Sequence, residues 1–289
     1  MKDLYLATYS YGPARLSTRE MVKTAKELGF QGMEFLSPLD KEMAAALREY
    51  DMKVIDTMEG PDEVGNIGSV DLLHELGIKY VCGTNLVAFG NHQQALWAAE
   101  RMNRAGKRLH ENGLKLYYHN HTHEWRKDGG EYLVETLLKN TDLDYLCLQM
   151  DAGWAACAGI DPVDFVKKYP GRVELMHVKA STGILGPEGV PFMAPPPDGD
   201  GSCHLGAPGE DAPEQGGPPP APSPEMQEAF KKIRQVSGAM KDCIIRYEEL
   251  MKAAEENGCK AFILERDEQY VADPIQCIRE DITELRKFW

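Results

Sequence analysis

The feature that most constrains the fold is a regular alternation of short apolar runs and helix-length amphipathic segments. A helix-length segment follows each of eight predicted strands: residues 4–7, 32–35, 53–55, 79–82, 114–118, 145–150, 173–176 and 261–264. No glycine-rich nucleotide motif lies at a strand-to-helix turn, which disfavours a dinucleotide fold. Eight such units in 289 residues predict an α/β fold, a single (β/α)8 TIM barrel over residues 1–289.

The alternation is interrupted once, after the seventh strand. Residues 183–224 are rich in Pro and Gly and show no apolar period. Because the alternation resumes afterwards, we interpret residues 181–238 as an inserted Pro/Gly-rich loop or lid, not as a linker between domains. We expect a helix over residues 225–236, and His204 lies inside the insertion.

The composition limits the classes of molecule that the protein is expected to bind. The formal net charge of −14 disfavours nucleic acid and anionic membranes, because Lys and Arg dominate phosphate binding. No apolar run reaches the ~18 residues of a membrane span, and Asp3 interrupts the segment where a signal peptide needs continuous apolar residues. We therefore expect a cytoplasmic protein with a small-molecule partner, and both homo- and hetero-oligomers remain open.

The most unusual segment is LYYHNHTHEW, residues 116–125. It places three histidines and Glu124 within six residues, in a chain that has only 8 histidines. Imidazoles beside a carboxylate suit a divalent transition metal, or a base that works next to one. Taken alone, the segment is explained equally well as a polar turn with solvated imidazoles.

Histidines and carboxylates also follow other predicted strands directly. In a TIM barrel the carboxyl ends of the strands form the active-site face. The polar residues found there are Glu34, Asp56, His119, His121, Asp151, His177, Lys179, Glu265 and Asp267. The fifth to eighth strands thus aim two histidines and two carboxylates at one place, a set that suits Mn²⁺, Co²⁺, Zn²⁺ or Fe²⁺. Four unrelated surface loops are the alternative interpretation.

Three segments carry a family resemblance: YYHNHTHEW, LQMDAGWAACAGIDPVDFVKKYPGRVELMHVKA and YEELMKAAEENGCKAFILERD. They resemble the sugar phosphate isomerase/epimerase group, whose fold is a xylose isomerase-like TIM barrel. The resemblance implies a divalent metal, with Mn²⁺ first and Co²⁺, Zn²⁺, Fe²⁺ or Mg²⁺ as alternatives. Asp151, His177 and Glu265 match the family's ligands. The fourth ligand is commonly a glutamate; His119 stands in its place, and Glu124 is its competitor.

The resemblance also implies roles near that metal. The residues predicted to be catalytic are His121 as acid/base, Glu265, and Lys179 as a contact to a substrate hydroxyl or oxyanion. His123 is predicted neither to bind the metal nor to move a proton. The residues predicted to contact substrate are Glu34, Asp56, Glu124, Trp154 and Asp267, and structural roles for Trp154, Glu34 and Asp56 fit equally well. Two departures stand out: Ala180 replaces an Asp that usually follows the Lys, and the insertion is unusually long.

These observations favour a metal-dependent isomerase or epimerase acting on a sugar, keto-sugar or cyclitol. Its reaction would be proton abstraction next to a metal-polarised carbonyl. The alternative is a lyase, either an inosose-type dehydratase or an enzyme that cleaves the C-glycosidic bond of 3-keto-glycosides. An endonuclease IV-like DNA repair enzyme shares the barrel, but the charge of −14 disfavours it. A non-catalytic partner subunit that docks through the Pro-rich segment is the fourth hypothesis.

Overall fold

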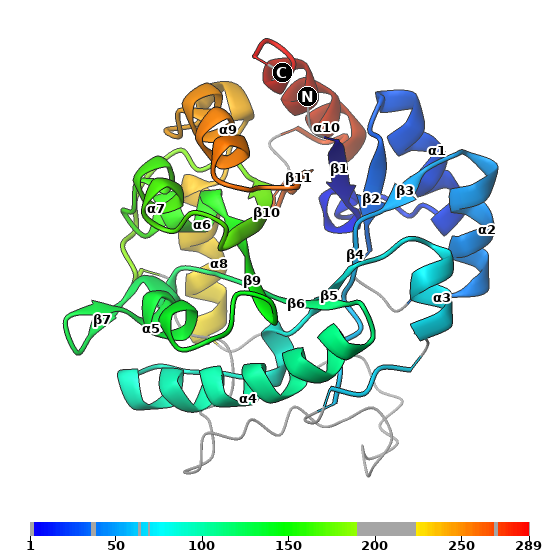
Figure 1. The fold of residues 1–289 in the computed structure, drawn as a ribbon. Helices are drawn as coiled ribbons and strands as arrows, with labels where there is room; N and C mark the ends of the chain where they lie inside the picture. The colour runs from blue at the N-terminus through cyan, green and yellow to red at the C-terminus, as the bar shows by residue number, and fades with distance from the viewer. Residues whose placement is uncertain are drawn as a thin grey trace.

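The strands form a parallel sheet that closes into a barrel (Figure 1). The computed structural model describes residues 3–35, 39–62, 65–68, 70–189, 224–268 and 271–288. The sheet order is β3-β2-β1-β11-β10-β9-β6-β5-β4, and the first and last of these strands are separated in sequence by Ile55 alone. Their bounds are β1 Leu4–Ala7, β2 Gly32–Glu34, β3 Lys53–Val54, β4 Asp56–Thr57, β5 Tyr80–Cys82, β6 Lys115–His119, β9 Leu146–Asp151, β10 Val173–Val178 and β11 Ala261–Leu264. The predicted TIM barrel is confirmed.

Helices surround this sheet, as the alternation of strands and helix-length segments predicted. The side chains of Ser17, Asp40, Asp161 and Asp273 each accept a backbone N–H at the first turn of a helix. The helices are α1 Thr18–Leu28, α2 Lys41–Glu49, α3 Val70–Glu75, α4 His92–Glu111, α5 Leu133–Lys139, α6 Ala152–Cys157, α7 Pro162–Lys168, α8 Pro224–Val236, α9 Tyr247–Glu256 and α10 Pro274–Leu285. None of the helices in the described ranges combines the length and apolarity needed to span a bilayer.

Three local features differ from the sequence-based expectation. The helix that follows the predicted strand 114–118 begins only at Leu133, because β8 (Glu131–Tyr132) pairs with β7 (Lys127–Asp128) in a small hairpin before it. The strands expected over 145–150 and 173–176 continue to Asp151 and Val178. Helix α6 was not expected; Asp151 ends β9 and also caps this helix.

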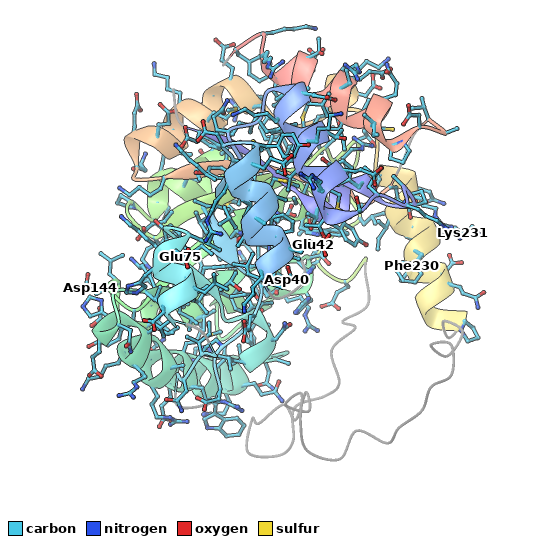
Figure 2. All side chains as sticks on the ribbon, turned by 90° about the vertical axis from the view of Figure 1, so that its right-hand side faces the viewer. Asp40, Glu42, Glu75, Asp144, Phe230 and Lys231 are labelled. Carbon is cyan, nitrogen blue, oxygen red and sulfur yellow. The ribbon has the colours of Figure 1, made fainter. Side chains whose placement is uncertain are left out.

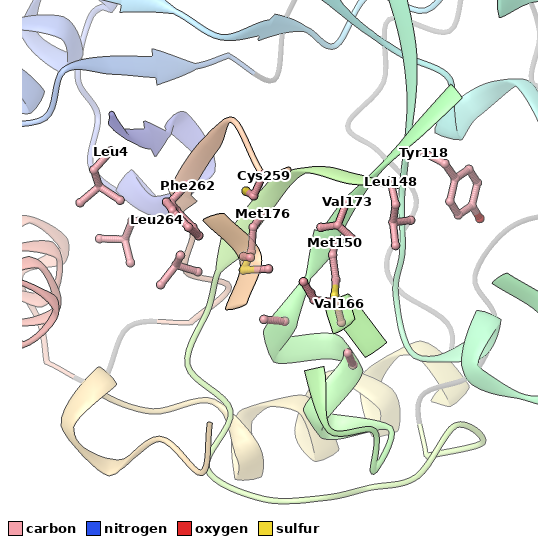
Figure 3. Packing of buried hydrophobic residues seen from close by; sticks show 14 of the residues in the cluster. Leu4, Tyr118, Leu148, Met150, Val166, Val173, Met176, Cys259, Phe262 and Leu264 are labelled. Atoms are coloured by element: carbon pink, nitrogen blue, oxygen red, sulfur yellow. The ribbon is translucent and has the colours of Figure 1, made fainter. Parts of the chain in front are cut away.

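Side chains alternate between the barrel lumen and the layer under the helices. Figure 3 shows Leu148 and Met150 of β9, and Val173 and Met176 of β10, packed on the helix-facing side. Gln149, between Leu148 and Met150, faces inward. In β10 a register shift between Val173 and Leu175 interrupts the alternation, so that Val173 faces the helices and Leu175 the lumen. The lumen is filled by Tyr5, Ala7, Tyr80, Cys82, Tyr117, Cys147, Leu175, Ala261 and Ile263. This packed layer separates the two ends of the barrel, so polar groups at one end do not meet those at the other.

The predicted insertion is described only at its two ends. Residues 190–223, which include His204, lie outside the described residues. At the amino-terminal end of the insertion, Leu185 N–H donates to the Cys157 carbonyl of α6 at 2.9 Å, and Thr182 N–H donates to the Val236 carbonyl of α8 at 2.8 Å. Figure 2 shows α8, marked by Phe230 and Lys231, at the end of the molecule opposite Asp144, which precedes β9. Helix α8 therefore lies toward the carboxyl ends of the strands.

Candidate active site

At the carboxyl ends of β6, β9, β10 and β11, polar side chains point to the same side of the sheet as the side chains that fill the lumen. In β6, Tyr117 lies in the lumen and His119 follows two residues later. The register places His119 beside Gln149, and His177 beside Asp151. Because inward positions recur every second residue, these strands deliver their polar ends into one space above the lumen.

Four of these side chains form a compact cluster: His119, Asp151, His177 and Glu265, whose potential ligand atoms all lie within 4.8 Å of one another. The Nδ1 atom of His177 is 3.1 Å from Glu265 Oε2 and 3.8 Å from Asp151 Oδ2. The Nε2 atom of His119 is 3.9 Å from Asp151 Oδ2. The structure thus brings together the four residues predicted as metal ligands, while Glu124, the competitor of His119, belongs to a different group.

The donors of this cluster fit a divalent cation. Asp151 Oδ1 accepts the Trp154 N–H at 2.7 Å, whereas the buried Asp151 Oδ2 lies 3.1 Å from the Lys179 ammonium, a cation that Glu265 and Asp267 share. Three buried carboxylates around one ammonium leave negative charge that a further cation would compensate. Ligand atoms about 2.1 Å from one ion lie about 3.0–3.4 Å apart. The separations here are 3.1, 3.8 and 3.9 Å, so the side chains would have to draw together slightly around an ion. Two imidazoles and two carboxylates suit Mn²⁺, Co²⁺, Zn²⁺ or Fe²⁺ and do not select among them.

Gln149, which the sequence analysis did not single out, fixes the orientation of His119. Its amide NH₂ donates to Glu34 Oε1 at 2.7 Å and to Asp56 Oδ2 at 3.2 Å, so its carbonyl oxygen faces His119 Nδ1 at 2.9 Å. A carbonyl oxygen only accepts, so Nδ1 of His119 carries the proton. Nε2 then presents its lone pair toward Asp151. The sequence holds one indication of this role. Gln149 precedes Asp151 by two residues on the same strand, so the two side chains point to the same side of the sheet.

His177 is held between two carboxylates. Its Nε2 atom is 2.9 Å from Glu34 Oε2, and its Nδ1 atom faces Glu265. Burial alone would lower the pKa of His177, but Glu34 and Glu265 together raise this pKa well above its ordinary value. A carboxylate on the outer nitrogen orients an imidazole for metal binding. Glu34 therefore aims Nδ1 of His177 into the cluster.

Lys179 places a buried ammonium group among the carboxylates. Its Nζ atom lies 2.7 Å from Glu265 Oε2, 2.9 Å from Asp267 Oδ1 and 3.1 Å from Asp151 Oδ2. It also lies 4.6 Å from the ring centroid of Trp154. Burial would lower the pKa of Lys179, but the three carboxylates raise it well above its ordinary value, so the ammonium is charged.

Two residues outside the predicted set position the backbone of Lys179. Its N–H donates to the Tyr247 hydroxyl at 2.9 Å, and that hydroxyl donates to the Lys179 carbonyl at 2.6 Å. A Cβ atom at Gly153 would lie 2.8 Å from the same carbonyl oxygen, closer than such contacts occur. Tyr247 and Gly153 therefore let α9 and α6 close around the end of β10. Their contacts depend on tertiary packing, and nothing in the local sequence marks them.

The carboxylates in and beside the four-residue cluster differ in their pKa values. Burial raises the pKa of Asp151 to about 6, although the charge of Lys179 opposes this shift. Burial would also raise the pKa of Glu265, but Lys179 and His177 hold it well below its ordinary value. Burial and the neighbouring Glu34 raise the pKa of Asp56 well above its ordinary value. Of these three carboxylates, Glu265 is therefore the one that stays ionised near neutral pH.

The remaining residues of LYYHNHTHEW form a second group: His121, His123 and Glu124. Glu124 is fully buried; its Oε1 atom accepts the Tyr118 hydroxyl at 2.8 Å and its Oε2 atom accepts the His121 N–H at 2.9 Å. His123 Nε2 lies 3.3 Å and His121 Nδ1 lies 3.9 Å from Glu124 Oε1. Burial would raise the pKa of Glu124, but His123 and His121 lower it to about 2.

The two imidazoles of this group differ in exposure. The side chain of His121 is 47% exposed, and its ring centroid is 5.0 Å from that of His119 and 6.1 Å from that of Trp154. Burial lowers the pKa of His123 to about 4. Burial would also lower the pKa of His121, but Glu124 raises it. His121 is thus the imidazole that borders both the four-residue cluster and solvent.

Comparison with known proteins agrees with this architecture. A profile of the xylose isomerase-like TIM barrel matches residues 22–288. The chain belongs to this family. Among solved structures, the sugar phosphate isomerase/epimerase from Parabacteroides distasonis superposes on this xylose isomerase-like barrel with a TM-score of 0.67 at 18% identity, covering 99% of this chain and 93% of that one. The resemblance inferred from the sequence is confirmed.

Two further relatives are dehydratases by name. The structure of the probable 3-DHS dehydratase from Bacillus anthracis gives a TM-score of 0.64 at 13% identity and covers 99% of each chain. The inosose dehydratase of Clostridium perfringens is 32% identical over 89 residues, which are 31% of this chain and 29% of that protein. The structural matches concern the fold, and the inosose dehydratase match spans less than a third of the relative's length.

Proposed function

We propose that this xylose isomerase-like barrel is a divalent-metal-dependent isomerase or epimerase that acts on a sugar, keto-sugar or cyclitol. The observation that carries the proposal is the cluster of two imidazoles and two carboxylates, in which the buried Asp151 Oδ2 shares the Lys179 ammonium with Glu265 and Asp267. His119, Asp151, His177 and Glu265 would hold the cation, which would act as a Lewis acid on a carbonyl and its neighbouring hydroxyl.

The chain itself supplies the groups that move the proton. Glu265, kept ionised by Lys179 and His177, takes a proton from the carbon next to the carbonyl. The Lys179 ammonium donates a hydrogen bond to a substrate oxygen, and Asp267 holds it in place. His121, on the solvent side, delivers or removes a proton at the substrate.

The remaining predicted contacts divide into two kinds. Trp154 lies beside both Lys179 and His121, so its ring offers a face for the apolar side of a sugar. Glu34, Asp56 and Glu124 are buried and hydrogen bonded to protein groups. Their contact with substrate stays a prediction, and the bonds that these carboxylates make support an orienting role.

A second candidate function is a lyase that eliminates a group from a keto-sugar or cyclitol. The observation that favours it is the segment shared with the inosose dehydratase of Clostridium perfringens. Elimination begins with the same proton abstraction and then needs an acid for the departing oxygen. His121, which faces solvent beside the cluster, is the group placed to provide that acid.

One experiment tests both candidates. Metal-stripped protein is reloaded with Mn²⁺, Co²⁺, Zn²⁺ or Mg²⁺ and incubated in D₂O with ketoses, 3-keto-sugars and inososes, and products are followed by NMR. Deuterium next to the carbonyl together with an isomer or epimer supports the first candidate. Loss of water or of an aglycone supports the second instead. No deuterium uptake with any metal and substrate would overturn both.

A further inference from the structure

The group formed by His121, His123 and Glu124 shares no residue with the four-residue cluster, and the proposed reaction uses only His121 from it. We propose that these three side chains form a second metal site, selective for Zn²⁺, and that its occupation inhibits the enzyme. The inhibitory part rests on the proposed function, because it assumes that His121 moves a proton. The metal site itself does not depend on that assumption.

The spacing of the donor atoms suits a small tetrahedral cation. His123 Nε2 and His121 Nδ1 lie 3.3 and 3.9 Å from Glu124 Oε1. Ligand atoms at about 2.0–2.2 Å from a tetrahedral Zn²⁺ lie about 3.3–3.5 Å from one another. The distance from His121 Nδ1 to Glu124 Oε1 would have to shorten by a few tenths of an ångström, and all three ligand atoms already lie within 4.8 Å of one another.

The carboxylate is preorganised for this role. Glu124 is fully buried, and hydrogen bonds from the Tyr118 hydroxyl and the His121 N–H fix its two oxygens. The turn that carries it, η3 (His123–Trp125), is anchored by the buried Trp125 side chain. A ligand held in place by hydrogen bonds loses little conformational freedom when a metal binds. Glu124 therefore needs almost no reorganisation to bind a metal.

The remaining coordination position faces water. The His121 side chain is 47% exposed, so an ion bound to it has access to solvent for a fourth ligand. Two imidazoles and one carboxylate favour Zn²⁺ over Mn²⁺ or Mg²⁺, which prefer oxygen-rich sites. Occupation fixes Nδ1 of His121 and withdraws this imidazole from proton transfer. Excess Zn²⁺ is therefore expected to inhibit turnover that another divalent metal supports in the four-residue cluster.

Zinc binding to metal-stripped protein tests the site without any activity measurement. Equilibrium dialysis against Zn²⁺ is compared for wild type, Asp151→Asn, His123→Ala and the double variant. Because the two groups share no ligand, we expect two bound ions, one, one and none. Co²⁺ gives a second readout, since the visible absorption of Co²⁺-loaded Asp151→Asn should disappear in the double variant. Equal zinc binding by Asp151→Asn and the double variant would overturn the site.

The inhibitory role needs its own comparison. His123 is outside the proposed proton-transfer machinery, so His123→Ala should keep wild-type turnover with Mn²⁺ and need at least about tenfold more Zn²⁺ for half inhibition. Unchanged inhibition in this variant would overturn the inhibitory role. If the alanine variant does not fold, His123→Gln keeps a polar group beside Glu124 and serves instead. Zinc binding by Asp151→Asn, with no turnover by wild type on any substrate, would leave the site standing and overturn the proposed function.

Discussion

The two ends of the barrel differ in how far cationic groups balance their carboxylates. At the amino ends of the strands, Glu174 pairs with Lys115 and accepts the Tyr80 hydroxyl at 2.8 Å. At the carboxyl ends, carboxylates outnumber the cationic groups that face them. The carboxylates there are Glu34, Asp56, Asp151, Glu265 and Asp267, and the cationic groups are Lys179 and His177.

Strand β10 shows this contrast within a few residues. Glu174 near its start has a cationic partner and a hydroxyl, whereas His177 and Lys179 at its end are each shared by several carboxylates. A buried charge that lacks a full partner is costly to folding. Such a surplus at one end, and not at the other, supports the cation site proposed at the carboxyl ends of the strands.

Asp151→Asn is expected to have the largest effect. Asparagine still caps α6 through its side-chain oxygen, so the helix is kept, while the negative charge that Asp151 contributes to the cluster is lost. We expect no Mn²⁺ binding at concentrations that saturate wild type, no thermal stabilisation by Mn²⁺, and no turnover. Isothermal titration and thermal unfolding with and without Mn²⁺ measure this.

The matched control is Asp161→Asn, the same change at the cap of α7. Its Mn²⁺ affinity should equal that of wild type. Normal Mn²⁺ binding by Asp151→Asn would contradict the assignment of the cluster.

His121→Ala should separate metal binding from chemistry. His121 is not among the four clustered ligands, so Mn²⁺ affinity should stay close to that of wild type. Loss of a general acid/base group typically lowers turnover by about 10²–10⁴-fold. Steady-state turnover with Mn²⁺ measures this, with His123→Ala as the neighbouring control. Wild-type turnover in His121→Ala would show that this imidazole does not move the proton.

The barrel and much of this cluster could be predicted from the sequence because they follow local rules. Strand periodicity and capping residues specify the elements, and the residue after each strand falls on the active face. Asp151 and Glu265 are examples, since each directly follows an apolar run. Within LYYHNHTHEW, the separation of His119 from the other two histidines could also be predicted in part, because His119 lies at an inward-facing position of β6.

What could not be predicted depends on residues that are distant in sequence. Gln149 looks like an ordinary strand residue, and its role appears only when Glu34 and Asp56 are brought to it by closure of the sheet. Glu124 is a different case, because its partners are close in sequence. The turn after β6 directs this carboxylate to the Tyr118 hydroxyl and to His121 and His123, away from the four-residue cluster, and the spacing of these residues alone does not specify that direction.

Gln149→Leu tests the support beneath the ligands and should have an intermediate effect. Leucine removes the partner of His119 Nδ1 and the donor to Glu34, so both imidazoles lose orientation. Changes in such outer contacts weaken metal affinity by about 10–100-fold. Mn²⁺ titration measures this, and Leu148→Met, on the helix-facing side of the same strand, is the control. Unchanged affinity in Gln149→Leu would mean that the ligands are oriented without the amide.

Tyr80→Phe at the amino end should have the smallest effect and one of a different kind. It removes the hydroxyl that donates to Glu174, but Lys115 still pairs with that carboxylate. We expect the free energy of unfolding to fall by about 1–2 kcal/mol, measured by urea denaturation. Because the lumen residues lie between the two ends, Mn²⁺ affinity should be unchanged. A shift in Mn²⁺ affinity would show that the packed lumen transmits changes from one end to the other, and the two ends could then no longer be treated as independent.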